Sequence, residues 1–260
     1  MDIYTMGVDI GSSASKAVIL RNGETVAARA IEPFGTGTEG PQRVYEAVLS
    51  QTGKLPEEIS RIVVTGYGRM NFPYSSEQLS ELSCHARGVG FLMPTVRTLV
   101  DIGGQDLKVL KIGPGGRLLN FQMNEKCAAG TGRFLEVMAR VLGVSIEELG
   151  PISERAQHPV SISNTCTVFA ESEVISQLAS GAGREDIAAG IHQSVAKRAA
   201  GMLKRVGLEP EIGMSGGVAQ NIGVVHAMEH ELKMSVLTHP DSQLAGAIGA
   251  ALVAYERLRA

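Results

Sequence analysis

The chain opens with three short apolar segments that have the length of β-strands. They cover residues 6–10, 17–20 and 25–31. A Gly/Ser-rich stretch separates the first two segments, and the Asn22-Gly23 step before the third is typical of a tight hairpin turn. The pattern therefore predicts a strand–turn–strand–turn–strand unit at the start of the chain.

The same pattern restarts at Leu99 after two expected helices and a β-rich run. At one constant offset the second copy repeats the first in four pairs: Asp9 and Asp101, Ile10 and Ile102, Gly11 and Gly103, and Lys16 and Lys108. The helices are expected over 41–51 and 77–91, and the β-rich run covers 61–65. Two copies of one unit indicate an internal duplication. We expect two lobes, residues 1–94 and 95–260.

Helical patterns dominate the second half of the chain. The expected helices cover residues 134–142, 168–178 and 187–206, a stretch that ends near 232, and residues 244–258; short strands are expected over 118–123, 211–215 and 234–237. Glycine at position 143 is a typical helix stop. The last helix is rich in small residues and can pack back on the first lobe. Strands that alternate with helices predict an α/β fold.

Composition narrows the class of protein. The chain has 260 residues, of which 44% are hydrophobic and 20% charged, and its formal net charge is -3. This balance is typical of a globular protein and gives no reason to expect nucleic acid or an anionic membrane surface as a partner. The sequence shows no signal-peptide pattern and no apolar run of membrane-spanning length. We therefore expect a cytoplasmic location.

The two matching polar turns are candidate phosphate-binding loops. Each lies between two strands, which is wrong for a Walker loop or a Rossmann fingerprint, but bare backbone N–H groups can still approach phosphate oxygens there. Asp9 and Asp101 end two strands and could hold a hydrated Mg²⁺, and Lys16 could meet a phosphate. One such turn alone is more often an ordinary hairpin. Two copies together with Gly216-Gly217 favour phosphate. The turn residues are Gly11, Ser12, Ser13, Ala14, Ser15, Lys16, Gly103, Gly104 and Gln105.

Two of the three cysteines stand just ahead of an expected helix. Cys127 precedes the helix over 134–142, and Cys166 precedes the helix over 168–178, where Glu171 is placed for a capping box with Thr167. A helix N-terminus favours a thiolate over a thiol. A cubane iron–sulfur cluster needs four thiolates. Either the pair is a coincidence of buried apolar cysteines, or two chains meet here. Cys84 lies mid-helix and is expected to be a core residue.

The motifs together resemble a known superfamily. Asp9-Ile10-Gly11-Ser12, Asp101-Ile102-Gly103-Gly104-Gln105 and Ser215-Gly216-Gly217 look like the phosphate and adenosine motifs of the actin-like ATPases, which include sugar kinases and heat-shock chaperones. The cysteine contexts narrow the resemblance to the activators of (R)-2-hydroxyacyl-CoA dehydratases. The chain resembles the ATPase subunits of benzoyl-CoA reductases more loosely. The resemblance implies two duplicated ribonuclease H-like lobes with ATP or ADP and Mg²⁺ in the cleft between them.

The resemblance also implies a cofactor and partners. It implies a homodimer with one [4Fe–4S] cluster held by Cys127 and Cys166 of each chain, loaded by reduced ferredoxin or flavodoxin. ATP hydrolysis would drive one electron into a partner dehydratase. Gln105 takes a place where a neutral amide can orient water, with Asp9 and Asp101 as the other catalytic candidates. By the same resemblance, the adenosine contacts are Gly216, Gly217, Gln220 and Gln243.

Two other functions stay open at this stage. A small-molecule kinase of the same fold would need a substrate cleft with a catalytic Asp. A cluster-free nucleotide sensor would keep its function when Cys127 and Cys166 become serine. The sequence does not name the acyl-CoA, because the substrate binds the partner.

Overall fold

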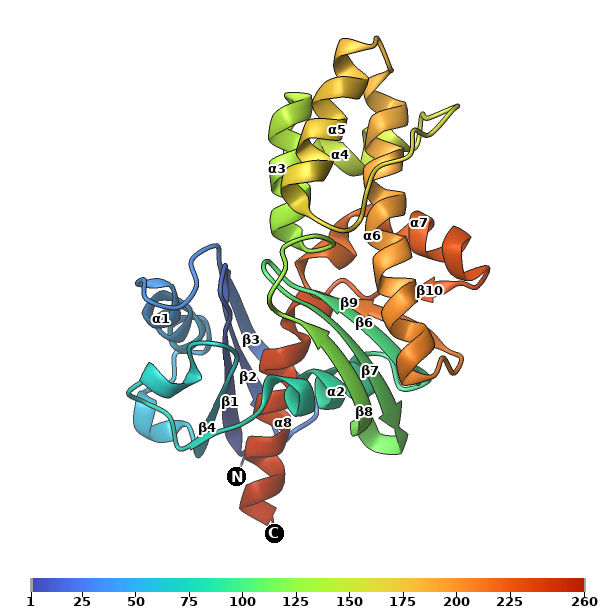
Figure 1. The fold of residues 1–260 in the computed structure, drawn as a ribbon. Helices are drawn as coiled ribbons and strands as arrows, with labels where there is room; N and C mark the ends of the chain where they lie inside the picture. The colour runs from blue at the N-terminus through green and yellow to red at the C-terminus, as the bar shows by residue number, and fades with distance from the viewer. Residues whose placement is uncertain (1, 260) are drawn as a thin grey trace. The chain divides into compact units, whose positions relative to one another are not determined.

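The structure is a computed structural model that describes residues 2–259 (Figure 1). Contacts divide the chain into two compact units. The first unit holds the residues up to Val96, Ile112–Leu119 and the chain from Asp241 onward, and the second holds Arg97–Lys111 and Asn120–Pro240. The chain thus leaves the second unit at its end and returns to the first. The single boundary near residue 94 stays a prediction.

The first unit is built on a five-stranded sheet. Its strands are β1 (Tyr4–Ile10), β2 (Ser15–Arg21), β3 (Thr25–Glu32), β4 (Arg61–Thr65) and β5 (Glu77–Gln78), in the order β3-β2-β1-β4-β5. The hairpin strands pair antiparallel, and β1 pairs parallel with β4. Asn22 and Gly23 both have positive φ values of 55° and 69°, as the expected tight turn requires.

Helices cover both faces of this sheet. They are α1 (Gly40–Thr52), α2 (Glu81–Leu92) and α8 (Ala245–Arg259). Met6, Val8 and Ile10 point to the core shared with α1, since side chains alternate along a strand. Gly7 faces α8, and a β-carbon there would lie 1.9 Å from the carbonyl oxygen of Ala247. The glycine therefore lets the last helix lie directly against β1.

The second unit repeats the sheet. Its strands are β6 (Thr98–Ile102), β7 (Leu107–Gly113), β8 (Arg117–Asn124), β9 (Ile212–Ser215) and β10 (Val236–Leu237), in the order β10-β9-β6-β7-β8. The strands β6 and β7 pair antiparallel, and β6 and β9 pair parallel. The strand order matches that of the first sheet, and the pairs of β6 have the same directions as the corresponding pairs of β1. This match confirms the predicted duplication of the α/β fold.

Five helices belong to the second unit (Figure 1). They are α3 (Gly132–Leu142), α4 (Ile146–Ser153), α5 (Thr167–Ala179), α6 (Arg184–Val206) and α7 (Ile222–Leu232). One apolar core joins these helices to β6, β7 and β9. Short 3₁₀ turns complete the described chain: η1 (Pro56–Glu58), η2 (Arg69–Asn71), η3 (Pro114–Gly116), η4 (Gly217–Gln220) and η5 (Ser242–Leu244). No helix between residues 2 and 259 is long and apolar enough to cross a membrane.

Two local predictions need correction, and one helix was not predicted. The helix expected from Glu77 begins at Glu81, because Glu77 and Gln78 instead pair with β4. The helix α4 was missed, although Ser145 and Glu148 form a capping box at its start. The capping box expected from Glu171 is wrong, since Cys166 is the N-cap of α5 and makes no side-chain cap bond.

Candidate functional site

The first polar turn is held by its own backbone and by an ion pair. Asp9 lies opposite Lys16 in the β1–β2 ladder, and the Gly11 N–H donates to the Ala14 carbonyl at 3.0 Å. The Lys16 ammonium lies 3.4 Å from the Asp9 carboxylate, which is buried. The turn thus carries a buried carboxylate and a partly exposed cation, the charges expected of a site for Mg²⁺ and phosphate.

The second polar turn has the same shape but a different charge arrangement. Asp101 lies opposite Lys108, and the Gly103 N–H donates to the Asp106 carbonyl at 3.0 Å. The Lys108 ammonium lies 3.4 Å from Asp101 and 2.7 Å from the Asp106 carboxylate. The Ser215 hydroxyl donates to Asp101 at 2.6 Å. Asp106 is not among the site residues predicted from the sequence, although its spacing within the turn could have identified it.

Glycines end the parallel strand beside each turn. Gly66 follows β4 with a φ of 87°, and Gly216 follows β9 with a φ of 83°. A β-carbon at Gly216 would lie 2.3 Å from the Ile102 carbonyl oxygen, and one at Gly66 would lie 2.5 Å from the Ile10 carbonyl oxygen. In both sheets, therefore, only glycine lets the loop pass close to the neighbouring strand.

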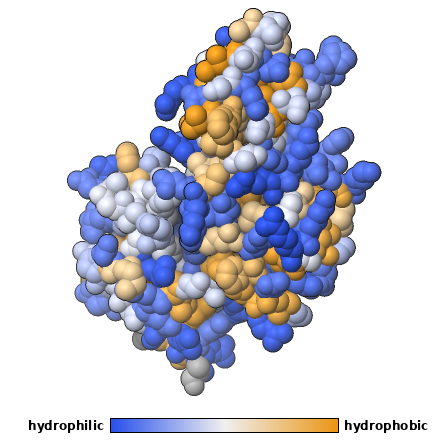
Figure 2. Space-filling model, viewed as in Figure 1, coloured by the Kyte–Doolittle hydropathy of each residue, from blue (hydrophilic) through white to orange (hydrophobic). Residues whose placement is uncertain are grey.

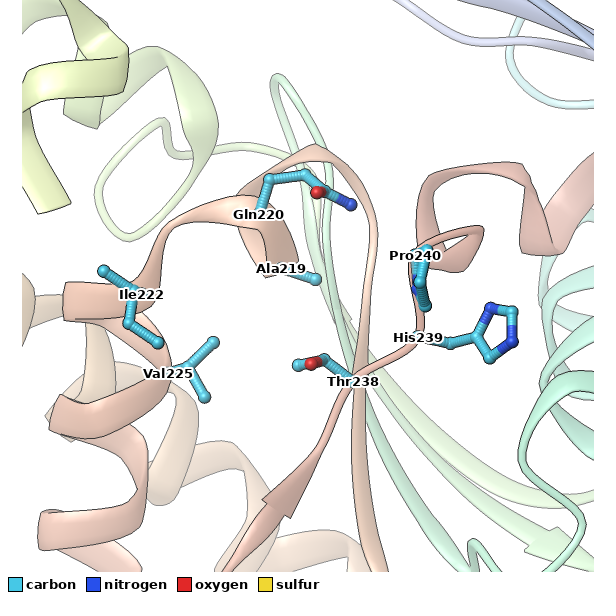
Figure 3. A pocket seen from close by; sticks show the side chains of 7 residues that line it. All are labelled: Ala219, Gln220, Ile222, Val225, Thr238, His239 and Pro240. Atoms are coloured by element: carbon cyan, nitrogen blue, oxygen red, sulfur yellow. The ribbon is translucent and has the colours of Figure 1, made fainter.

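A cavity of about 350 Å³ opens in the second unit beyond Gly216 and Gly217. Its lining residues are Ala219, Gln220, Ile222, Val225, Thr238, His239 and Pro240. Figure 3 shows Ile222 and Val225 on one side and Thr238 facing them, while the His239 ring points away. A cavity with an apolar floor and a few polar groups suits a planar base. Gln220 lies in this cavity, but Gln243 lies in η5, which belongs to the first unit.

The structure brings the two cysteine-bearing segments together. We call residues 124–131 the Cys127 loop and residues 163–167 the Cys166 segment. The Cys127 thiol lies 3.7 Å from the Thr165 carbonyl oxygen, next to Cys166. Both cysteines are half-buried, and Cys166 forms the N-cap of α5. The two thiols that the sequence placed at separate helices therefore belong to one site.

The start of α3, which directly follows the Cys127 loop, is hydrogen-bonded to the second polar turn. The Gly132 N–H donates to the Gly103 carbonyl at 2.9 Å, and the Arg133 N–H donates to the Gly104 carbonyl at 2.8 Å. Thr131, the N-cap of α3, is fully buried, and its hydroxyl donates to the Ala128 carbonyl. The first turn of α3 thus fastens the cysteine loop to the candidate phosphate loop.

The two cysteines could supply half of the ligands of an iron–sulfur cluster. Across residues 2–259, no group of three or more His, Cys, Asp or Glu side chains is placed to hold a metal ion. Thr167 follows Cys166 directly, and its hydroxyl oxygen is buried without a hydrogen-bond partner. Thiolates are the ligands of iron–sulfur clusters, whose sulfurs accept hydrogen bonds. One chain therefore supplies two thiols and a hydroxyl that could donate to the cluster.

Cys84 lies outside this site, as expected. It is fully buried in α2, and burial raises the pKa of its thiol to about 12, against the hydrogen bond with Thr65, which lowers the pKa. An inert thiol of this kind is a packing residue. Its neighbour His85 is also buried, with Nε2 4.0 Å from the Asp9 carboxylate.

Two duplicated sheets, matching polar turns and a base-sized cavity define an ATPase of the actin-like fold. A family model matches residues 6–254, and the chain belongs to the BadF/BadG/BcrA/BcrD ATPase family. The 2-hydroxyisocaproyl-CoA dehydratase activator of Clostridioides difficile is 57% identical over 99% of this chain and 97% of its own length.

Two solved structures have the same fold. The activator of the 2-hydroxyisocaproyl-CoA dehydratase from Clostridium difficile, with bound ADPNP, superposes with a TM-score of 0.95 over 99% of this chain and 96% of that one, at 57% identity. Component A of the Acidaminococcus fermentans (R)-2-hydroxyglutaryl-CoA dehydratase has a TM-score of 0.96 and 49% identity, over 99% of this chain and 100% of that one. The predicted resemblance is confirmed.

Proposed function

We propose that the protein is an ATP-dependent activator of a 2-hydroxyacyl-CoA dehydratase. ATP hydrolysis would drive one electron from a [4Fe–4S] cluster, reduced by ferredoxin or flavodoxin, into the partner enzyme. The observation that carries the proposal is the pair of hydrogen bonds from Gly132 and Arg133 to Gly103 and Gly104. They join a cysteine site to a candidate phosphate loop, which is the connection that ATP-driven electron transfer needs. The names of the similar proteins support the role of a dehydratase activator that binds a nucleotide.

Cys127 and Cys166 of two chains would hold the cluster on a shared axis. The bound cluster would supply the low-potential electron. The described chain offers only two thiols at the site, so a second copy is the natural source of the other two. The helix α5, whose N-cap is Cys166, exposes Val168, Phe169 and Ile175, by 66%, 66% and 52%. In Figure 2, hydrophobic residues gather at the surface over the helices α3 and α5. This apolar surface beside the cysteines is suited to pairing with a second copy.

The polar turns would bind the nucleotide. Asp9 and Asp101 would hold a hydrated Mg²⁺, Lys16 would meet a phosphate, and Gln105, which is exposed, would orient the attacking water. The cavity at Gln220 would take the base, with Gly216 and Gly217 beside the ribose, and Gln243 as a further contact. An amide at position 105 suits hydrolysis better than transfer to a substrate hydroxyl.

A benzoyl-CoA reductase-type ATPase subunit and a small-molecule kinase are the alternatives. The former would use the same cysteines with a different partner. The kinase leaves the cysteine site without a purpose, which is why we favour the activator.

The test is anaerobic purification followed by iron analysis, visible absorption and dimer mass. We expect about four irons per dimer. Both Cys127→Ser and Cys166→Ser should lose the iron, whereas Cys84→Ser, the matched control, should retain it. A colourless, iron-free protein that still hydrolyses ATP after anaerobic reconstitution would contradict the proposal.

A further inference from the structure

One arginine of α6 contacts both cysteine-bearing segments. The Arg198 guanidinium donates through Nη1 to the Asn164 carbonyl at 2.7 Å, two residues before Cys166. Its aliphatic part packs against the Cys127 loop at Gly130. A β-carbon added to that glycine would lie only 2.7 Å from the Arg198 Cδ. A single side chain thus touches a residue close in sequence to each cysteine.

The backbone of both segments is shaped around this side chain. Gly130 has a φ of 81°, a left-handed conformation that favours glycine, and the stem of Arg198 fills the space where a side chain would stand. The Asn164 carbonyl accepts from Arg198, and the next carbonyl, that of Thr165, faces the Cys127 thiol. Two successive carbonyls of the Cys166 segment therefore accept from Arg198 and from the Cys127 thiol.

The positive charge of Arg198 is not neutralised by a carboxylate in the described part of the chain. No ion pair forms there, and its buried Nε has no hydrogen-bond partner. Arg198 is partly buried, and a partly buried cation without a counter-charge is stabilised when an anion comes close to it. A cluster ligated by four thiolates is such an anion, and it becomes more negative when it is reduced.

We propose that Arg198 is a positioning residue of the cluster site: it holds the Cys127 loop and the Cys166 segment together and places a positive charge beside them. The inference rests on the proposed function, and it assigns a role to a residue that is not a ligand. Removing the charge should make the cluster harder to reduce, since net charge is one of the factors that set cluster potentials. Removing the contacts of the Arg198 side chain should make the backbone of both segments more mobile.

The test compares Arg198→Gln and Arg198→Lys with Lys197→Gln. Lys197 is the exposed neighbour on α6, so its replacement removes the same charge without touching either segment. Three measurements are made on anaerobically prepared protein. They are hydrogen–deuterium exchange of the two segments in the iron-free state, the rate of iron loss to a ferrous chelator, and the midpoint potential of the cluster.

We expect Arg198→Gln to exchange faster in both segments and to move the midpoint to a more negative potential. Iron loss should be about 10-fold faster, the lower end of the effect of outer-shell partners on metal sites. In Arg198→Lys, the midpoint potential should be closer to the wild-type value than the hydrogen–deuterium exchange rates are. Lysine keeps the positive charge but lacks the planar guanidinium group that forms the hydrogen bond. Lys197→Gln should match the wild type.

Two results would overturn the inference, and they are distinguishable. An iron-loaded wild type whose Arg198→Gln variant matches Lys197→Gln in all three measurements contradicts the role of Arg198 alone. A wild type that holds no iron contradicts the proposed function, and the role at the cluster falls with it.

Discussion

The two sheets are copies of one arrangement that differ in the loop after the third strand. In the first unit, the loop from β3 to α1 donates the Thr36 N–H to the Gly11 carbonyl at 2.9 Å. In the second unit, the Gly132 N–H at the end of the loop from β8, where α3 begins, donates to the Gly103 carbonyl at the same distance. The duplicated bond holds each loop against its turn, and only the second loop carries a cysteine.

The lysines of the two turns show a second difference. Lys16 contacts one carboxylate and its side chain keeps 15% of its exposure, whereas Lys108 lies between Asp101 and Asp106 and keeps 4%. One lysine is therefore available to a phosphate, and the other neutralises its own turn. Equivalent positions of the duplicated sequence therefore differ in exposure and in charge partners.

The largest difference in stability between the two turns should come from replacing the aspartates at the strand ends. We expect Asp101→Asn to lower the free energy of unfolding by about 3 kcal/mol, the lower end for breaking a buried pair, because Lys108 keeps Asp106. Asp9→Asn should cost less, since Lys16 reaches solvent. Chemical denaturation of both variants measures the difference. Equal losses would show that the two turns are electrostatically alike.

A smaller and equal effect is expected at the two strand-end glycines. Gly66→Ala and Gly216→Ala should each destabilise the protein by about 2 kcal/mol, since both positions combine positive φ with a close carbonyl oxygen. Gly181→Ala is the control, because its φ is 86° but no atom lies within 4 Å of the added carbon. Thermal unfolding of the three variants separates the backbone strain of a positive φ from the steric clash of the added β-carbon. A loss of stability in Gly181→Ala as large as in Gly216→Ala would show that the clash contributes nothing.

The effect that is smallest per step is a pH dependence of stability that arises in the second unit, at most about 1.4 kcal/mol for each pH unit. His192 of α6 is buried, with Nδ1 3.0 Å from the Ser153 hydroxyl, and burial lowers its pKa to about 3. In the unfolded chain the imidazole takes a proton near pH 6.5, whereas in the folded chain it stays neutral. Stability is therefore complete above pH 6.5 and is lost as the pH falls toward 3, by up to about 1.4 kcal/mol per pH unit.

Unfolding between pH 7 and pH 5 checks this slope. His192→Gln should flatten it, because a glutamine amide can still bond to Ser153 without titrating. Asn221, the N-cap of α7, lies 3.3 Å from the other ring nitrogen, so the variant also tests the contact between His192 and Asn221. An unchanged slope in His192→Gln would assign the pH dependence to other groups.

Much of the fold was predictable because its signals are local. The Asn22-Gly23 turn, the glycine stop at Gly143 and the run 61–65 each specify a backbone conformation within a few residues. The repeat was predictable because the offset between Asp9 and Asp101 preserves an entire pattern. The helix α4 was missed although its capping box is a local signal, and the strand at Glu77 was missed because only pairing with β4 defines it.

The candidate site divides in the same way. The positions of Cys127 and Cys166 before helices, and of Asp9 and Asp101 at the ends of matching strands, are readable from the residues alone. Only the folded chain shows that the two cysteine segments meet, that Asp106 and Ser215 lie beside Asp101 and Lys108, and that Arg198 contacts both segments. The two kinds of feature differ in the sequence distance over which their interactions act. Backbone preferences act over a few residues, whereas the position of a thiol or a charge depends on the packing of helices far apart in the chain.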